Sequence, residues 1–106
     1  MELPGKVRLG LKRFSAELCR KYGDAEVYLF GSYARGDWLN DSDVDVIVVS
    51  KAFENYGFTE RIKQVRMLAP KNIGFEILAY TPEEFKAKAS TSVVIQDASQ
   101  YWLRVD

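Results

Sequence analysis

The chain has 106 residues, of which 47% are hydrophobic and 13% aromatic, so residues 1–106 can form one domain with a sizeable core. Fifteen basic and fifteen acidic residues give zero formal charge, which argues against broad non-specific binding to nucleic acid. One cysteine and no histidine exclude a disulfide framework, a cysteine–histidine zinc site and histidine-assisted nucleophiles. No apolar run is long enough to span a membrane and no signal peptide is evident, so we expect a cytoplasmic location.

The first half of the chain predicts a helix, a strand, a short helical turn and a second strand. Apolar residues recur every three or four positions over residues 5–22, with Lys and Arg between them, which indicates an amphipathic helix. Residues 25–30 are typical of a strand. Ser32 then stands where it could cap a short helical turn. Residues 43–50 are nearly all apolar apart from two aspartates, which favours a central strand.

The second half begins with a looser segment over residues 51–58. Thr59 opens a predicted helix that Pro70 ends. Three apolar residues spaced for one helical face form its expected inner side: Ile62, Val65 and Leu68. A third strand is predicted over residues 73–80.

The clearest helix start in the chain is Thr81-Pro82-Glu83-Glu84. Thr81 caps, proline occupies the first helical position, and Glu84 completes a capping box. This helix is expected to continue to Val94 or Asp97, and a last short strand is expected over residues 101–105. The order of elements predicts an α/β (α+β) fold with a mixed central sheet of about four strands and helices packed against it.

Three aspartates stand at the entrance to the second strand: Asp41, Asp43 and Asp45. Residues two apart on a strand point to the same side, so Asp43 and Asp45 are aimed together. Neighbouring carboxylates are unfavourable unless a cation lies between them, and such oxygen ligands suit two Mg²⁺ ions, or Mn²⁺. A calcium loop of the EF-hand type is excluded because its sixth position is Val46 and its twelfth is Ala52.

The segment before these aspartates is suited to a polyphosphate. Gly31 allows close approach of the backbone to a ligand, and Ser32 adds a hydroxyl to the free N–H groups of the turn. Arg35 could reach a phosphate or instead pair with Asp37. The alternative to a phosphate and metal site is a simple β-hairpin with a polar connection. That alternative does not explain why the charged residue Asp45 lies inside an apolar strand.

Gly31-Ser32, ten intervening residues and then Asp43-Val44-Asp45 resemble the signature of the polymerase-β-like nucleotidyltransferase superfamily. The words "LFGSYARGD" and "SDVDVIVV" are similar to its minimal nucleotidyltransferase (MNT) branch. The resemblance implies that Gly31 and Ser32 contact the β- and γ-phosphates and that Asp43 and Asp45 bind metal ions. It implies that Glu76 is a third carboxylate that binds metal or acts as base. The alternative for Glu76 is a solvated position on the sheet.

The resemblance also implies a reaction and a partner. An acceptor hydroxyl would attack the α-phosphate of a nucleoside triphosphate, and pyrophosphate would leave. Members of the MNT branch usually pair with a small helical HEPN protein. In such a toxin–antitoxin pair the MNT member can be the antitoxin, transferring AMP from ATP to a tyrosine of the HEPN ribonuclease. Two alternatives stay open: a non-catalytic module that masks a partner, and a nucleotidyltransferase that acts on RNA or a small molecule.

A few further side chains have weaker predicted roles. Tyr33 and Trp38 could stack on a base, although packing in the core or loop is favoured. Asp41 and Ser42 are expected to shape the turn before the second strand, and Lys51 could contact a ligand. Apolar residues near the C-terminus could serve a homo-oligomer or a hetero-complex: Tyr101, Trp102 and Leu103.

Overall fold

The computed structural model describes residues 3–39, 42–91 and 103–105. The elements are, in chain order, α1 (Gly5–Tyr22), β1 (Glu26–Phe30), α2 (Gly31–Arg35), β2 (Val44–Val49), the 3₁₀ helix η1 (Lys51–Asn55), α3 (Phe58–Leu68), β3 (Phe75–Tyr80), α4 (Pro82–Thr91) and β4 (Leu103–Val105). The strands form one mixed sheet in the order β3-β2-β1-β4. β1 is antiparallel to β2 and β4, whereas β2 and β3 are parallel. The predicted fold class and four-stranded mixed sheet are confirmed.

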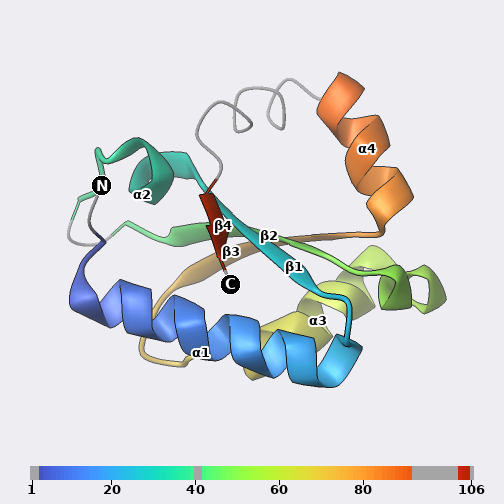
Figure 1. Cartoon of the computed structure of the whole chain (residues 1–106), viewed down its shortest axis with the longest axis horizontal. Helices are drawn as coiled ribbons and strands as arrows, with labels where there is room; N and C mark the ends of the chain where they lie inside the picture. Colours follow the sequence, from blue (N-terminus) through green and yellow to red (C-terminus); the bar gives the residue numbers. More distant parts are fainter. Residues whose placement is uncertain (1–2, 40–41, 92–102, 106) are drawn as a thin grey trace.

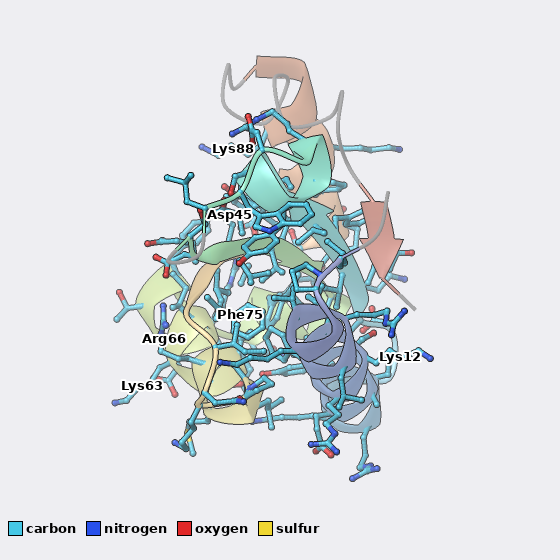
Figure 2. The ribbon with its side chains drawn as sticks, turned by 90° about the vertical axis from the view of Figure 1, so that its left-hand side faces the viewer. Lys12, Asp45, Lys63, Arg66, Phe75 and Lys88 are labelled. Carbon is cyan, nitrogen blue, oxygen red and sulfur yellow. The ribbon has the colours of Figure 1, made fainter. Side chains whose placement is uncertain are left out.

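The two faces of the sheet are covered by different helices (Figure 1). α1 and α3 lie on one face, and the main core forms there from alternate residues of the strands, including Val44, Val46 and Val48. Figure 2 shows Phe75 of β3 directed toward this layer, where its ring lies 5.0 Å from the ring of Phe14. α4 covers part of the other face. None of the helices in the described residues is long and apolar enough to cross a membrane.

η1 is an element that the sequence analysis did not predict, since residues 51–58 were expected to be looser. The Ser50 hydroxyl accepts a hydrogen bond from the Ala52 N–H at 3.1 Å and donates one to the Asp24 carboxylate at 2.6 Å. The same carboxylate accepts from the Lys51 N–H at 2.9 Å. These hydrogen bonds, the one from Ser50 first, lower the pKa of Asp24. Asp24 lies 26 residues before Ser50, so the local sequence pattern around η1 cannot reveal it as a partner.

The inner face of α3 includes the charged residue Arg61, whereas the sequence predicted an inner face of apolar residues alone. Val65 is fully buried as expected, but Ile62 is only half-buried, and Arg61 is buried with an exposed fraction of 5%. The Arg61 guanidinium donates to both carboxylate oxygens of Glu84, at 2.5 and 3.2 Å. It also donates to the carbonyl oxygens of Tyr56 and Ala79 at 2.8 and 3.3 Å. Satisfied hydrogen bonds explain how an arginine can replace an apolar residue here.

The predicted capping box at the start of α4 is confirmed. The Thr81 N–H donates to Glu84 Oε1 at 2.9 Å, and the Glu84 N–H donates to Thr81 Oγ1 at 3.2 Å. Helix α4 begins at Pro82 as expected. Four residues named in the predictions for this part of the chain lie outside the described residues: Val94, Asp97, Tyr101 and Trp102.

Candidate active site

Three carboxylates lie at the end of the sheet where the parallel strands β2 and β3 both begin. Asp45 is paired in register with Glu76 on β3 and with Phe30 on β1. Paired residues of neighbouring strands direct their side chains to the same face of a sheet. Asp43 directly precedes β2, two residues before Asp45. The structure therefore places the three predicted acidic residues together, with Asp45 half-buried and the other two exposed.

The environment of Asp45 disfavours its ionised form. Burial raises the pKa of Asp45, and the negative charges of Glu76 and then Asp43 raise it further, whereas Arg35 acts in the opposite direction. In the part of the chain that the structure describes, none of the three carboxylates takes part in a hydrogen bond or an ion pair. A half-buried carboxylate beside two like charges is the kind of group that a cation would stabilise.

The donor chemistry fits a hard divalent cation, because all three groups are carboxylates on neighbouring positions. The side chains are nevertheless not gathered into a preformed site. Among residues 3–39, 42–91 and 103–105, no three His, Cys, Asp or Glu side chains lie close enough together to hold a metal ion. A bound cation would have to draw the carboxylates inward against their mutual repulsion.

Gly31 lies directly against the Asp45 carboxylate. A Cβ atom at Gly31 would stand 2.0 Å from Asp45 Oδ2, and Gly31 has a φ of +72°. Both observations require glycine, the first for space and the second for backbone conformation. The predicted N-cap at Ser32 is wrong, because α2 begins at Gly31 after the extended residue Phe30, with no side-chain cap.

A second glycine supports the other aspartate, and the sequence analysis missed it. A Cβ atom at Gly74 would stand 2.5 Å from Asp43 Oδ1. The carbonyl oxygen of Gly74 accepts a hydrogen bond from the Val44 N–H at 2.9 Å, which joins the start of β3 to the start of β2. The available signal was a glycine just ahead of an apolar strand, a position that often marks close approach. Gly74 therefore sets the space into which the Asp43 carboxylate fits.

We expect Gly74→Ala to lower the rate of the transfer reaction that the resemblance implies about tenfold or more, because the added methyl group would displace the Asp43 carboxylate by rotation of its side chain. The melting temperature should change little, since Gly74 is exposed and the neighbouring atom belongs to a side chain that can turn. Gly57→Ala is the matched control, because a Cβ there meets nothing within 4 Å. Equal rates for the two variants, measured with saturating substrate, would contradict a positioning role for Gly74.

Arg35 pairs with Asp37 in this structure, as the second of its two predicted roles requires. Its Nε atom lies 3.3 Å from Asp37 Oδ2, and both side chains are substantially exposed. Its charge still acts on the acidic site, because it lowers the pKa of Asp45. Exposed ion pairs contribute at most about 1 kcal/mol, so an anion could take the place of Asp37 at small cost.

The remaining predicted residues are placed as follows. Tyr33 is buried and stacks on Trp38, with ring centroids 5.3 Å apart and 12° between the ring planes, so the packing interpretation is confirmed. The Ser42 hydroxyl accepts from the Leu39 N–H at 2.8 Å and shapes the turn, whereas Asp41 lies outside the described residues. Lys51 follows the opposite end of β2 from the carboxylates.

Comparisons with known proteins identify relatives of this chain. The family model described as a nucleotidyltransferase domain matches residues 11–101 of the chain. A Methanocaldococcus jannaschii protein that is provisionally named a protein adenylyltransferase is 34% identical over 79 residues, which cover 74% of this chain and 76% of the relative. A second protein of that organism, with the same provisional name, is 40% identical over 48 residues, covering 43% of this chain and 48% of the relative.

Two crystal structures share the fold. One, of a provisionally named nucleotidyltransferase, is 27% identical, covers 91% of this chain and 97% of the other, and has a TM-score of 0.62. The other, from Sulfolobus solfataricus, is 24% identical with 77% of each chain covered and a TM-score of 0.54, and it shows the shared fold alone. Since the family model spans most of the chain and includes Gly31, Ser32, Asp43 and Asp45, the protein belongs to the nucleotidyltransferase domain family, as a minimal member with nucleotidyltransferase activity.

Proposed function

We propose that this nucleotidyltransferase transfers AMP from ATP to a hydroxyl group on a protein, in a reaction that requires Mg²⁺. The observation that carries the proposal is the placement of Asp43, Asp45 and Glu76 on one end of the sheet, with Gly31 against Asp45. The provisional names of the two archaeal relatives, which describe protein adenylyltransferases, support AMP as the transferred group and a protein as the acceptor.

Each residue of the site has a task in this reaction. The backbone at Gly31 and the hydroxyl of Ser32 would hold the β- and γ-phosphates next to Asp45. Arg35 would exchange its exposed pairing with Asp37 for a phosphate oxygen. Magnesium ions, when held by the carboxylates, would supply charge neutralisation on the triphosphate and the leaving pyrophosphate.

Glu76 is placed to act on the acceptor. It is exposed and belongs to β3, which is an edge strand of the sheet, so a protein surface can approach it. Its carboxylate would take the proton of the acceptor hydroxyl. The acceptor oxygen then forms a bond to the α-phosphorus while the bond from that phosphorus to the β-phosphate oxygen breaks. Pyrophosphate leaves with the electron pair, and AMP stays on the acceptor.

We further propose that the acceptor is a tyrosine of a HEPN-domain protein and that this chain acts as the antitoxin of the pair. Support comes from the resemblance of residues 29–37 and 42–49 to the MNT branch. The exposed position of Glu76 on an edge strand also suits an acceptor carried by a large partner.

The test is to incubate the protein with its co-purifying partner, Mg²⁺ and ATP labelled at the α-phosphate. Label should enter a partner tyrosine, and ATP labelled at the γ-phosphate should leave the partner unlabelled. A chelator should stop the transfer. Incorporation of label into RNA or a small molecule, with none in any partner protein, would contradict a protein acceptor.

A further inference from the structure

A cavity of about 480 Å³, which we call the α4 groove, opens between the start of β1 and the first turn of α4. Its walls are mainly apolar. Tyr28 and Phe85 stack with their ring centroids 5.4 Å apart and 19° between the ring planes, and Val49 and Pro82 line the same cavity. The volume falls within the usual range of ligand pockets. The roles proposed for the active-site carboxylates and for the Gly31-Ser32 turn do not use this groove.

The charged side chains of the α4 groove are mostly acidic. Asp24, Glu26 and Glu83 line it, and Lys86 is the one basic residue among the described residues that do so. Hydrogen bonds, the one from the Ser50 hydroxyl first, lower the pKa of Asp24, so this carboxylate stays ionised at neutral pH. Aromatic walls with acidic groups beside them are complementary to a side chain that has an apolar stem and a cationic head.

The α4 groove and the active-site carboxylates occupy the two ends of one face of the sheet. Phe30 is paired with Asp45 at one end, and Glu26 is paired with Val49 at the other. Paired residues and alternate residues of one strand share a face, so Tyr28 lies on this face between the two ends. α4 stands at the opposite end of the sheet from α2 (Figure 1). Glu26 and Phe30 are four residues apart on β1, so the two ends are roughly 13 Å apart.

We propose that the α4 groove binds an arginine side chain of the acceptor protein, about four residues from the hydroxyl that receives AMP, an inference that rests on the proposed function. An extended segment advances about 3.3 Å per residue, so four residues laid along this face cover the distance between the two ends. Arginine is favoured over lysine because its planar guanidinium stacks on aromatic rings and donates to two carboxylates at once. A cation carried by the acceptor is favoured over a free one because the groove shares its face with the transfer site.

The experiment uses short synthetic peptides that contain one tyrosine and one arginine in a neutral sequence. The two residues are placed four positions apart or next to each other, and in a third peptide citrulline, which has the shape of arginine without its charge, replaces it at the four-residue spacing. With Mg²⁺ and α-labelled ATP, the four-residue arginine peptide should have a KM about three- to tenfold lower than either other peptide. The kcat should be the same for all three, because the groove touches none of the reacting atoms.

Variants of the groove identify the residues responsible. Glu26→Gln and Glu83→Gln should each raise the KM of the arginine peptide about three- to tenfold and leave that of the citrulline peptide unchanged. Both should fold, since Glu83 is exposed and glutamine at position 26 keeps the oxygen that accepts from the Tyr28 hydroxyl. Glu54→Gln is the matched control, because Glu54 is an exposed residue of η1 that does not line the groove. Glu83→Lys should reverse the preference, in favour of a peptide with glutamate in place of arginine.

A binding measurement without ATP separates the groove from the chemistry. Fluorescence anisotropy of the dye-labelled arginine peptide should show binding that weakens with added salt and in Glu83→Gln, and the citrulline peptide should bind more weakly. Equal KM values for the arginine and citrulline peptides, or label in the partner protein with none in any peptide, would overturn the docking site while leaving the proposed function standing. Charge-dependent binding with no transfer to any peptide or protein would support the groove and contradict the proposed function. If there were neither binding nor transfer, both would be wrong.

Discussion

Replacement of Asp45 by asparagine is expected to lower nucleotidyl transfer by about 10³-fold while leaving the fold intact. Asp45 is the central carboxylate of the site, between Asp43 and Glu76, and it lies against Gly31. Asparagine keeps the size of the side chain but removes the negative charge, and loss of one preorganised charged group at a reaction centre costs about 10²–10³-fold in rate. Transfer of α-labelled phosphate per minute, at saturating ATP and Mg²⁺, measures this effect.

The same substitution should raise stability at neutral pH, which separates a functional from a structural role. Because the pKa of Asp45 is raised in the folded protein, the native state holds its proton more tightly than the unfolded chain. The stability contributed by that proton is complete below the ordinary pKa of 3.8 and is lost as the pH rises through the raised folded value. At pH 7 the ionised group therefore opposes folding, and asparagine removes the opposition.

Thermal unfolding at pH 7 should accordingly give Asp45→Asn a melting temperature equal to or above that of the wild-type protein, and the difference should shrink in acid. Glu54→Gln is the control, since it removes the charge of an exposed carboxylate on η1. It should leave the rate unchanged. An Asp45→Asn variant that is fully active, or that unfolds at a lower temperature at pH 7, would show that Asp45 has a structural role.

The largest effect on stability is expected from Arg61→Met. Removal of one partner from a fully buried ion pair costs about 3–5 kcal/mol. The Arg61 side chain is 6% exposed but that of Glu84 is 36% exposed, so solvent reduces the expected cost to about 2–3 kcal/mol. Here the groups left behind are the Glu84 carboxylate and the carbonyl oxygens of Tyr56 and Ala79. For a domain of this size each kcal/mol corresponds to about 4–8 °C in melting temperature. Urea denaturation of the variant measures the loss in free energy of unfolding.

An exposed arginine provides the comparison. Arg20 pairs with Glu17 at 3.1 Å, but its side chain is 75% exposed, so Arg20→Met should change the free energy of unfolding by about 1 kcal/mol or less. In the double variant Arg61→Met/Glu84→Leu, part of the stability should return, because no unpaired carboxylate remains. If Arg61→Met cost no more than Arg20→Met, the buried network would contribute little to the fold.

The parts of the fold that local pattern predicts are those whose partners are close in the sequence. The capping box at Thr81 and Glu84 spans four residues, and both of its hydrogen bonds are confirmed. The 3₁₀ helix η1 was missed because it is held by Asp24, and the burial of Arg61 was missed because Glu84 lies 23 residues away. A charged residue on a helix predicts exposure until its distant partner is known.

The candidate site divides in the same way. The alternation of a strand was enough to place Asp43 and Asp45 together, but the pairing of Asp45 with Glu76 depends on the register between β2 and β3. That register follows from a crossover through α3, which residue spacing does not encode. The close packing of Gly74 against Asp43 likewise joins two segments that are 31 residues apart, so the sequence could mark the glycine but could not identify Asp43 as its partner.

The position of the carboxylates in the sheet has a consequence for how a polyphosphate can be neutralised. In most open α/β sheets, ligands gather beyond the carboxyl ends of the strands, where the helices that follow present the positive ends of their macrodipoles. Here the acidic residues stand at the amino ends of β2 and β3, while α3 and α4 begin beyond the opposite ends of those strands. The dipoles of α3 and α4 can then not offset anionic charge at the site, so that compensation must come from the backbone N–H groups at Gly31 and Ser32, cationic side chains and dissolved metal ions.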